Sequence, residues 1–474
     1  MTGEKASKKA IFLLLFLVLG VRIAYLAVFH ERVFLGPSTQ YDQAFVAIHL
    51  LEGEGVRTYK EPPRVVESAD PSRLIDPERY APPSEETFPY IKEVTGYAGF
   101  LTLVWKITGT KLWIYPQAMQ VLFETLVALG LYLLALKSFG RRAAFWTALG
   151  FAFLVFEARS SVVPYKDIFL LYVMLGIAFL SRLLFLRRGR PLFGFAGVAV
   201  LTAAGFHFMP SVAFYPFFLA FVLALARRVD LKTGAACLLV AAAVMGLAVY
   251  PYQAYVRAHR GEPGVPEPLF WYRFWLGAKV ESFASTQEER FQDFFREKLP
   301  ATGLTLEQFC KREFLAEVKA NPAKYAARTA KKLLSGMFLV YANAGDCTME
   351  TSWARFKAVN PRAGFKDYVK AHPARVLGMG LGTLSVSVLF PLALVAAAIL
   401  VRRKRGAEAL LFLHIPLYFL LLHMFFHYEA RYLLGTLPGS LPLIGFLFGD
   451  VLPIHRIREK KSLHGFRNHF GGRP

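Results

Sequence analysis

The chain has 474 residues, of which 55% are hydrophobic, and it contains 44 phenylalanines. This apolar content excludes a soluble globular protein of this size and indicates a polytopic membrane protein that forms a single bundle. The formal charge of +22 would suit nucleic-acid binding if the basic residues formed one patch, but they occur in short clusters between hydrophobic runs. That distribution is typical of cytoplasmic loops, so no nucleic-acid partner is expected.

The first hydrophobic run, residues 10–29, follows three lysines, Lys5, Lys8 and Lys9. It is long for the core of a signal peptide and lacks a small-residue cleavage site. We therefore predict an uncleaved first transmembrane helix with its N-terminus in the cytoplasm. Arg22 lies near its outer end, where its side chain either reaches the interface or holds an anion.

Residues 30–94 form the first outer loop, and several prolines exclude a long helix there. The spacing of apolar residues predicts a helix over 41–51, with Asp42 near its start. An aspartate at that place either compensates the helix dipole or serves a site. The following apolar run, 98–107, is too short to span a membrane, so we expect it to be interfacial or re-entrant.

Basic clusters fix the expected topology, because positive loops stay in the cytoplasm. They predict about ten crossings (range nine to thirteen), with both termini cytoplasmic, at roughly 10–29, 111–136, 143–157, 168–186, 191–208, 211–226, 233–252, 376–401, 408–426 and 433–453. The expected organisation is a first transmembrane helix (1–29), a first outer loop with an acidic motif (30–96), a transmembrane bundle (97–252), a second outer region (253–375), C-terminal transmembrane helices (376–453) and a basic cytoplasmic tail (454–474).

The second outer region shows two helix starts. Thr305 and Gln308 fit a capping box, and Asn321-Pro322 fits an N-cap followed by proline at the first helical position. The two predicted helices are amphipathic and basic, which suits a membrane surface or a small soluble domain. Of the three cysteines, Cys310 and Cys347 could pair if both lie outside the cytoplasm, and Cys237 has no partner in spacing.

The most informative stretch is 427–438, which places ionisable groups and tyrosines between two hydrophobic runs. Charges at a membrane boundary are costly unless they face a partner or a water-filled cavity, so this stretch is a site hypothesis. An interfacial tyrosine belt with an internal Glu-Arg pair is the alternative. Its candidate residues are His427, Glu429, Arg431 and Tyr432.

The predicted topology brings polar residues from separate segments to the outer side. They are Asp42, Lys92, Glu157, Arg159, Tyr165, Lys166, Asp167, His207 and the 427–432 stretch. This favours a catalytic or binding cavity that opens to the outer leaflet. A transporter would more often carry polar and helix-breaking residues near the middle of the membrane in two related halves, which the sequence does not show.

The residue types in this set suit group transfer from a phosphodiester. Asp42 or Asp167 could accept a proton from an incoming hydroxyl or amine. Arg22, Lys92, Lys166 and Arg431 could neutralise a phosphate on which charge develops. The three cysteines and scattered carboxylates predict no metal site.

Several segments, in order, resemble the multi-pass GT-C glycosyltransferases of the protein-mannosyltransferase and aminoarabinose-transferase type. Tyr41-Asp42 opening a helix that ends in Leu50-Leu51-Glu52-Gly53 is similar to the acidic first-loop motif of the family. Residues 92–97, with Phe100 and Leu101, resemble its Lys-Pro-Pro-Gly-Tyr segment, although Glu93, Val94 and Thr95 stand in place of the prolines. Further similar segments are Ser160-Ser161 with Lys166-Asp167, Asn321-Pro322 with Tyr325, and Glu429-Ala430-Arg431-Tyr432 with Pro438, which is the most specific. Around His207 the chain departs from the family, many of whose members carry an Arg-Pro pair.

The resemblance implies a GT-C-type helical bundle with two sizeable non-cytoplasmic regions that carry amphipathic helices. It implies transfer of a hexose or pentose from a polyprenyl-phosphate donor, with inversion, to a lipid, protein or glycan acceptor at the outer face of the plasma (inner) membrane. Asp42 would be the catalytic base. Lys92 and Arg431, with Arg22, His207 and Lys166, would hold the phosphate. The substrate-shaping set would be Glu429, Tyr432, His427, Tyr41 and Tyr97, and Asp167 would support the catalytic site. No cofactor is expected, and a divalent metal is left open.

Two alternatives remain at this level. A lipid-linked glycan flippase or other transporter would need charged residues that line a path to the cytoplasmic face. A surface polysaccharide polymerase or ligase would use similar chemistry on longer glycans.

Overall fold

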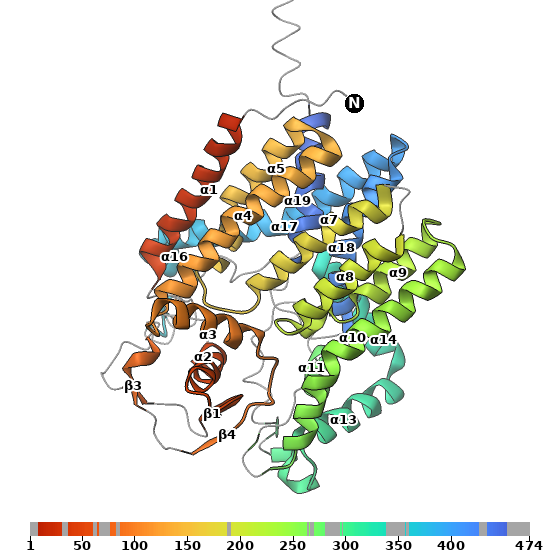
Figure 1. Cartoon of the computed structure of the whole chain (residues 1–474). Coiled ribbons are helices and arrows are strands. Elements are labelled where there is room, and N and C mark those ends of the chain that lie inside the picture. The colour runs from red at the N-terminus through yellow and green to blue at the C-terminus, as the bar shows by residue number, and fades with distance from the viewer. Residues whose placement is uncertain are drawn as a thin grey trace, which may run out of the picture.

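The computed structural model describes residues 8–30, 37–59, 64–65, 76–81, 86–186, 191–262, 265, 270–279, 294–295, 297–337, 356, 360–425 and 434–452. Within these ranges the chain is almost entirely helical, with four short strands. Figure 1 shows a bundle of long helices on one side of the molecule and a set of shorter elements on the other.

The long helices identify the chain as an all-α polytopic membrane protein. Six described helical segments are long and apolar enough to cross a membrane. They correspond to α1 (Lys8–Phe29), α4 (Ile114–Phe139), α7 (Ile168–Leu186), α10 (Leu231–His259), α18 (Gly406–Phe425) and α19 (Leu437–Phe446), the last continued by the π-helical turn η6 (Leu447–Val451).

Four further helices occupy the remaining segments that the sequence predicts to cross. They are α5 (Arg141–Phe153), α8 (Pro191–Phe206), α9 (Tyr215–Leu225) and α17 (Pro373–Arg402). Every predicted crossing therefore coincides with a helix, and the predicted fold class is confirmed. The run expected not to cross forms α3 (Gly96–Thr108), a helix of 13 residues that is too short for an unaided span.

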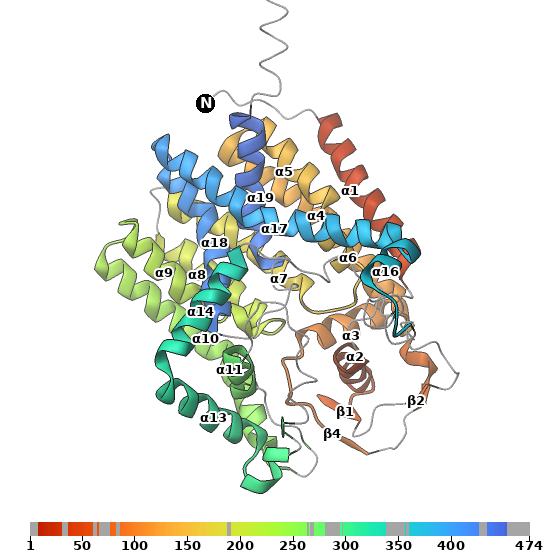
Figure 2. The ribbon, with the colours of Figure 1, turned by 180° about the vertical axis from the view of Figure 1, so that it is seen from behind.

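Two basic side chains, Arg182 and Arg405, reach the C-terminal end of α4. The Arg405 guanidinium donates to the Ser138 carbonyl oxygen at 2.9 Å, and Arg182 donates to that of Lys137 at 2.7 Å. At the other end, the Gly96 amide donates to the His207 carbonyl oxygen at 2.8 Å. Figure 2 shows from behind that α2 and α3 lie below the long helices of the bundle.

The segment between α1 and α3 builds a small layer beside the bundle. It comprises α2 (Pro37–Leu51), the 3-10 turn η1 (Pro77–Arg79), and four strands, β1 (Arg57–Tyr59), β2 (Arg64–Val65), β3 (Tyr80–Ala81) and β4 (Thr87–Pro89). Strand β1 pairs antiparallel with β4, with Thr58 opposite Phe88, and β2 pairs with β3. Aromatic residues fill the core between α2 and α3, among them Tyr41, Phe45, Tyr90, Tyr97, Trp105 and Trp113.

The segment between α10 and α17 contains α11 (Phe270–Lys279), the turn η3 (Pro300–Thr302), α13 (Leu306–Ala320), α14 (Pro322–Met337) and α16 (Phe365–Ala371). The predicted capping box is present, because the Thr305 hydroxyl accepts from the Gln308 amide and the Gln308 side chain accepts from the Thr305 amide. Helix α14 begins at Pro322, as predicted. Cys310 is a buried free thiol, and Cys347, its suggested partner, lies outside the described residues.

Two short elements complete the described chain, α6 (Val155–Ser160) and the turn η2 (Pro210–Val212). Helices α5 and α19 approach each other closely at Gly445. A Cβ atom at Gly445 would lie 2.1 Å from the Thr147 hydroxyl oxygen and 2.4 Å from the Ala143 carbonyl oxygen. Small residues allow membrane helices to approach in this way, so packing of backbone against backbone holds these helices together.

We expect Gly445→Ala to destabilise the bundle by about 1–3 kcal/mol, because the added methyl group forces α19 away from α5. Thermal unfolding of the protein in detergent measures this as a lowered Tm. Gly246→Ala on α10 is the matched control, since a Cβ atom there would meet nothing within 4 Å. Equal melting of the two variants would contradict the packing argument.

Candidate functional site

An ion pair between α2 and the segment before α3 forms the centre of the candidate site. The Lys92 ammonium lies 3.0 Å from the Asp42 carboxylate, and about a quarter of each side chain is exposed (27% and 25%). Helix α2 begins at Pro37 and has no acidic residue in its first turn. The alternative in which Asp42 is a helix-start residue is therefore wrong, because the helix begins earlier than the apolar spacing suggested.

A buried glutamine fixes the two members of this pair relative to each other. The Gln43 side-chain amide donates to the Val94 carbonyl oxygen at 3.2 Å, and its oxygen accepts from the Ala98 amide at 3.2 Å. Gln43 is fully buried and directly follows Asp42 in the chain. The segment that carries Lys92 is thereby tied to the helix that carries Asp42.

Glu93 joins three parts of the chain at the same place. Its carboxylate pairs with the Lys166 ammonium, just before α7, and lies 3.1 Å from the Arg273 guanidinium on α11. Burial by itself would raise the pKa of Glu93, but Lys166 and Arg273 outweigh it and hold the pKa at about 2. The carboxylate is therefore a permanent anion, and it anchors the residue next to Lys92.

Asp42 has the opposite electrostatic balance. Burial raises the pKa of its carboxyl above the ordinary value of 3.8, although Lys92 acts in the lowering direction. The negative charge of Glu93 adds to the increase. A carboxylate with a raised pKa holds a proton more strongly, which suits a base that takes a proton from an acceptor.

The turn before α7 is held by α4. The Gln120 side-chain amide donates to the carbonyl oxygens of Ser161 and Val163, and its oxygen accepts from the Tyr97 hydroxyl at 3.0 Å. Tyr97 is fully buried, so this residue, expected to shape the substrate site, packs and orients the surrounding segments. Tyr41, the other such tyrosine, is 9% exposed and lies edge-on to Trp113.

Two cations expected to hold phosphate are already engaged with protein groups. Arg22 is fully buried, and its guanidinium pairs with Glu157 and donates to the carbonyl oxygens of Phe151 and Ala152. Lys166 is 6% exposed and pairs with Glu93. An internal carboxylate neutralises each cation, because a charge left uncompensated inside the protein is costly. That Arg22 and Lys166 hold phosphate therefore stays a prediction.

The remaining described candidates lie at the same end of the bundle. The side chain of His207 is exposed, and its backbone carbonyl binds Gly96. Asp167 follows Lys166 directly and is only 3% exposed. His427, Glu429, Arg431 and Tyr432 lie outside the described residues.

The residues that follow the 427–432 stretch are described from residue 434 onward, and they lie near the turn before α7. Gly435 lies in the turn before α19, and a Cβ atom there would be 2.9 Å from the Leu170 side chain in the first turn of α7. Leu170 lies three residues beyond Asp167. The described chain that follows residues 427–432 therefore passes beside the turn that carries Lys166 and Asp167.

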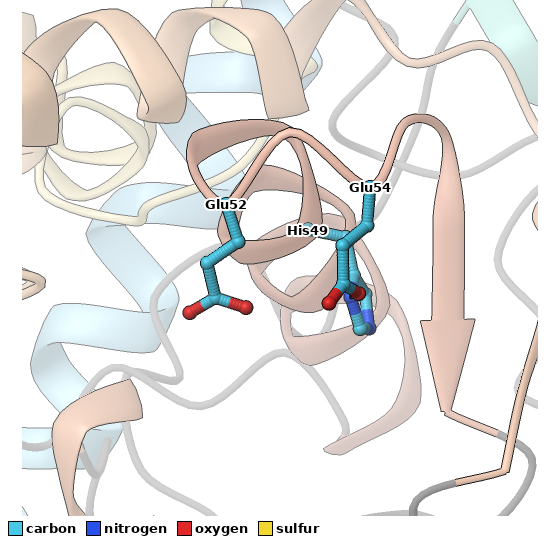
Figure 3. A group of neighbouring side chains, drawn as sticks. All are labelled: His49, Glu52 and Glu54. Carbon is cyan, nitrogen blue, oxygen red and sulfur yellow. Dashed lines mark hydrogen bonds and ion pairs between the residues drawn. The ribbon is translucent and has the colours of Figure 1, made fainter.

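Sequence reasoning missed Glu93 and Arg273 as parts of the site. Glu93 was noted only as a departure from a motif, and Arg273 is 180 residues away from it in the chain. It also missed a group of potential metal ligands, His49, Glu52 and Glu54, at the end of α2 (Figure 3). Their spacing along the chain does not match a known metal-binding motif, so the group is recognised only in the folded structure.

No protein-family model and no curated protein matches the chain. Among solved structures, the archaeal oligosaccharyltransferase AglB from Archaeoglobus fulgidus, in complex with an inhibitory peptide and a dolichol-phosphate, is similar at 15% identity with a TM-score of 0.49, over 98% of this chain and 52% of that one. ArnT from Cupriavidus metallidurans, bound to undecaprenyl phosphate, is similar at 13% identity with a TM-score of 0.42, over 97% of this chain and 80% of that one. This chain spans about half the length of the oligosaccharyltransferase.

We expect Glu93→Gln to destabilise the protein by about 3 kcal/mol, because it leaves Lys166 buried without its counter-charge. The pKa of Glu93 is lowered in the folded protein, so its contribution is complete above pH 4.5 and disappears as the pH falls toward 2. Melting curves at several pH values should therefore converge for wild type and variant in acid.

Glu262→Gln is the control for this prediction, since Glu262 pairs with His259 at the surface and is 45% exposed. It should change stability by less than about 1 kcal/mol. A Glu93→Gln protein that melts like wild type at neutral pH would show that Glu93 does not anchor the site.

Proposed function

We propose that the protein is a membrane glycosyltransferase that moves a sugar from a polyprenyl-phosphate donor to an acceptor at the outer face of the membrane. The observation that carries the proposal is the Asp42–Lys92 pair, a carboxylate of raised pKa in contact with a partly exposed ammonium. A base and a phosphate-binding cation are the two groups that such a transfer requires. The sequence motifs around both residues resemble those of the GT-C enzymes.

In the proposed reaction, Asp42 accepts the proton of the acceptor hydroxyl or amine while the acceptor attacks the anomeric carbon. The bond between that carbon and the phosphate oxygen breaks, and the polyprenyl phosphate leaves with the bonding electron pair. Attack from the side opposite the phosphate inverts the anomeric configuration. Lys92 neutralises the charge that grows on the departing phosphate, acting as a point charge.

Asp42 is preferred over Asp167 as the base because of its exposure. A quarter of the Asp42 side chain is accessible, whereas Asp167 is 3% exposed. Asp167 and Glu93 would then position neighbouring groups. Arg431 would supply a second phosphate contact and Glu429 would orient it, with Tyr432, His427 and the exposed His207 near the sugar.

We further propose that the site faces the periplasm or the outside of the cell, with both termini in the cytoplasm of a plasma (inner) membrane protein. The arrangement of basic side chains supports this orientation, because those at 182 and 405 gather at the end opposite the Asp42–Lys92 pair. The sugar transferred, a hexose or a pentose, and the acceptor, a lipid, protein or glycan, are left to experiment.

We expect Asp42→Asn to lower transfer by about 10²–10⁴-fold, since the amide cannot accept a proton. Membranes from cells that express matched amounts of wild type, Asp42→Asn or the control Glu262→Gln are compared by their glycan profiles. One sugar modification should disappear in Asp42→Asn alone, and it identifies the substrate. An unchanged profile in Asp42→Asn at matched protein levels would remove Asp42 as the base.

The pH dependence of transfer tests the pair itself. Because Asp42 must be unprotonated to act and its pKa is raised, activity should fall as the pH drops through a value above 3.8. Lys92→Met removes the cation that lowers this pKa, so the acid limb of kcat should move to higher pH, and KM for the donor should rise. An acid limb at the same pH in both proteins would contradict the coupling of Lys92 to Asp42.

A further inference from the structure

The C-terminal end of α2 gathers three side chains that metals favour. One ligand atom from each of His49, Glu52 and Glu54 lies within 4.8 Å of the others, and this is the one group of its kind among the described residues. Figure 3 shows the side chains around the end of the helix, with His49 beside Glu54. The His49 Nδ1 atom lies 2.6 Å from the Glu54 Oε2 atom.

Two glycines allow the turn that places the Glu54 carboxylate next to His49. Gly53 and Gly55 have φ angles of +81° and +86°, a left-handed conformation that glycine adopts without strain. The Glu54 amide donates to the His49 carbonyl oxygen at 2.8 Å, which closes the turn. The turn also lies at the negative end of the α2 dipole, where a cation is stabilised.

The histidine is held in a fixed position at the end of α2. His49 is 2% exposed, and its ring centroid lies 4.8 Å from that of Tyr59. Its Nδ1 atom faces the Glu54 carboxylate, so a cation bound there would take the place of the proton between the two groups.

We propose that His49, Glu52 and Glu54 bind one divalent cation of the zinc type. A mixed set of imidazole nitrogen and carboxylate oxygen suits zinc, whereas calcium and magnesium prefer oxygen alone. Ligand atoms about 2.1 Å from one tetrahedral zinc ion lie about 3.4 Å apart. A separation of 4.8 Å must therefore shorten by about 1.4 Å, and the 2.6 Å separation between His49 and Glu54 must lengthen. Glu52 is 46% exposed and would exchange its present partner, Lys111, for the ion, and water would complete the coordination.

The proposed cation is distinct from the catalytic pair. His49 lies two helical turns beyond Asp42, which is about 10 Å along the axis. The ion therefore does not touch the base, and it fixes the end of the helix that carries the base. The proposal holds whether or not the protein transfers a sugar.

Zinc titration of the purified full-length chain tests the proposal. The protein carries no histidine tag, is treated with a chelator, and is titrated with zinc chloride in a calorimeter. Because the chain contains 11 histidines, weak additional binding is expected, and the deciding measurement is the difference between variants. Glu52→Gln with Glu54→Gln should weaken the tightest site about tenfold or more, and both residues are exposed enough for the fold to persist.

His49→Ala should have the same effect, and His259→Ala is its matched control. His259 also pairs with one glutamate, Glu262, at 2.8 Å, but the described residues provide no third ligand there. Lys111→Gln should tighten zinc binding, because the Lys111 ammonium lies 3.1 Å from Glu52 and competes with the ion. Equal zinc affinity of wild type and the double glutamine variant overturns the proposal, as does the absence of a tight site in wild type.

Discussion

The ion pairs of the Glu93 carboxylate are the interaction on which the arrangement of the candidate site depends. The carboxylate is almost buried, and it persists as an anion because Lys166 and Arg273 approach it from two other parts of the chain. A buried charge without such partners would strongly destabilise the fold. Satisfying Glu93 therefore forces the segment before α3, the start of α7 and helix α11 to meet at one place.

The same requirement explains the fate of Arg22 inside the bundle. Its guanidinium is fully buried and is neutralised by Glu157 and two backbone carbonyl groups. The charge of Arg22 is thus matched within the protein, whereas Lys92 and Arg273 keep appreciable exposure beside an acid. The difference in exposure separates side chains that hold the fold from those that are available to a substrate.

A site between the helical bundle and the layer around α2 is well placed for the chemistry that we propose. A polyprenyl chain needs an apolar surrounding, whereas a sugar and a phosphate need polar partners. The long helices provide the first, and the segments around Asp42 and Lys92 provide the second. The glutamine contacts of Gln43 and Gln120 hold those segments against the bundle, so that base and cation are positioned before a substrate arrives.

The amino-acid sequence by itself determined the class of fold and the approximate positions of the helices. Runs of apolar residues, basic clusters and local caps such as Thr305 with Gln308 act over a few residues, so their outcome can be read along the chain. It also named Asp42 and Lys92, because their motifs are local. Only the tertiary structure decided that Lys166 and Arg22 are internally paired and that Arg273 reaches Glu93. These contacts join residues 73 to 180 positions apart, and which charge meets which depends on how the helices pack, which no local pattern encodes.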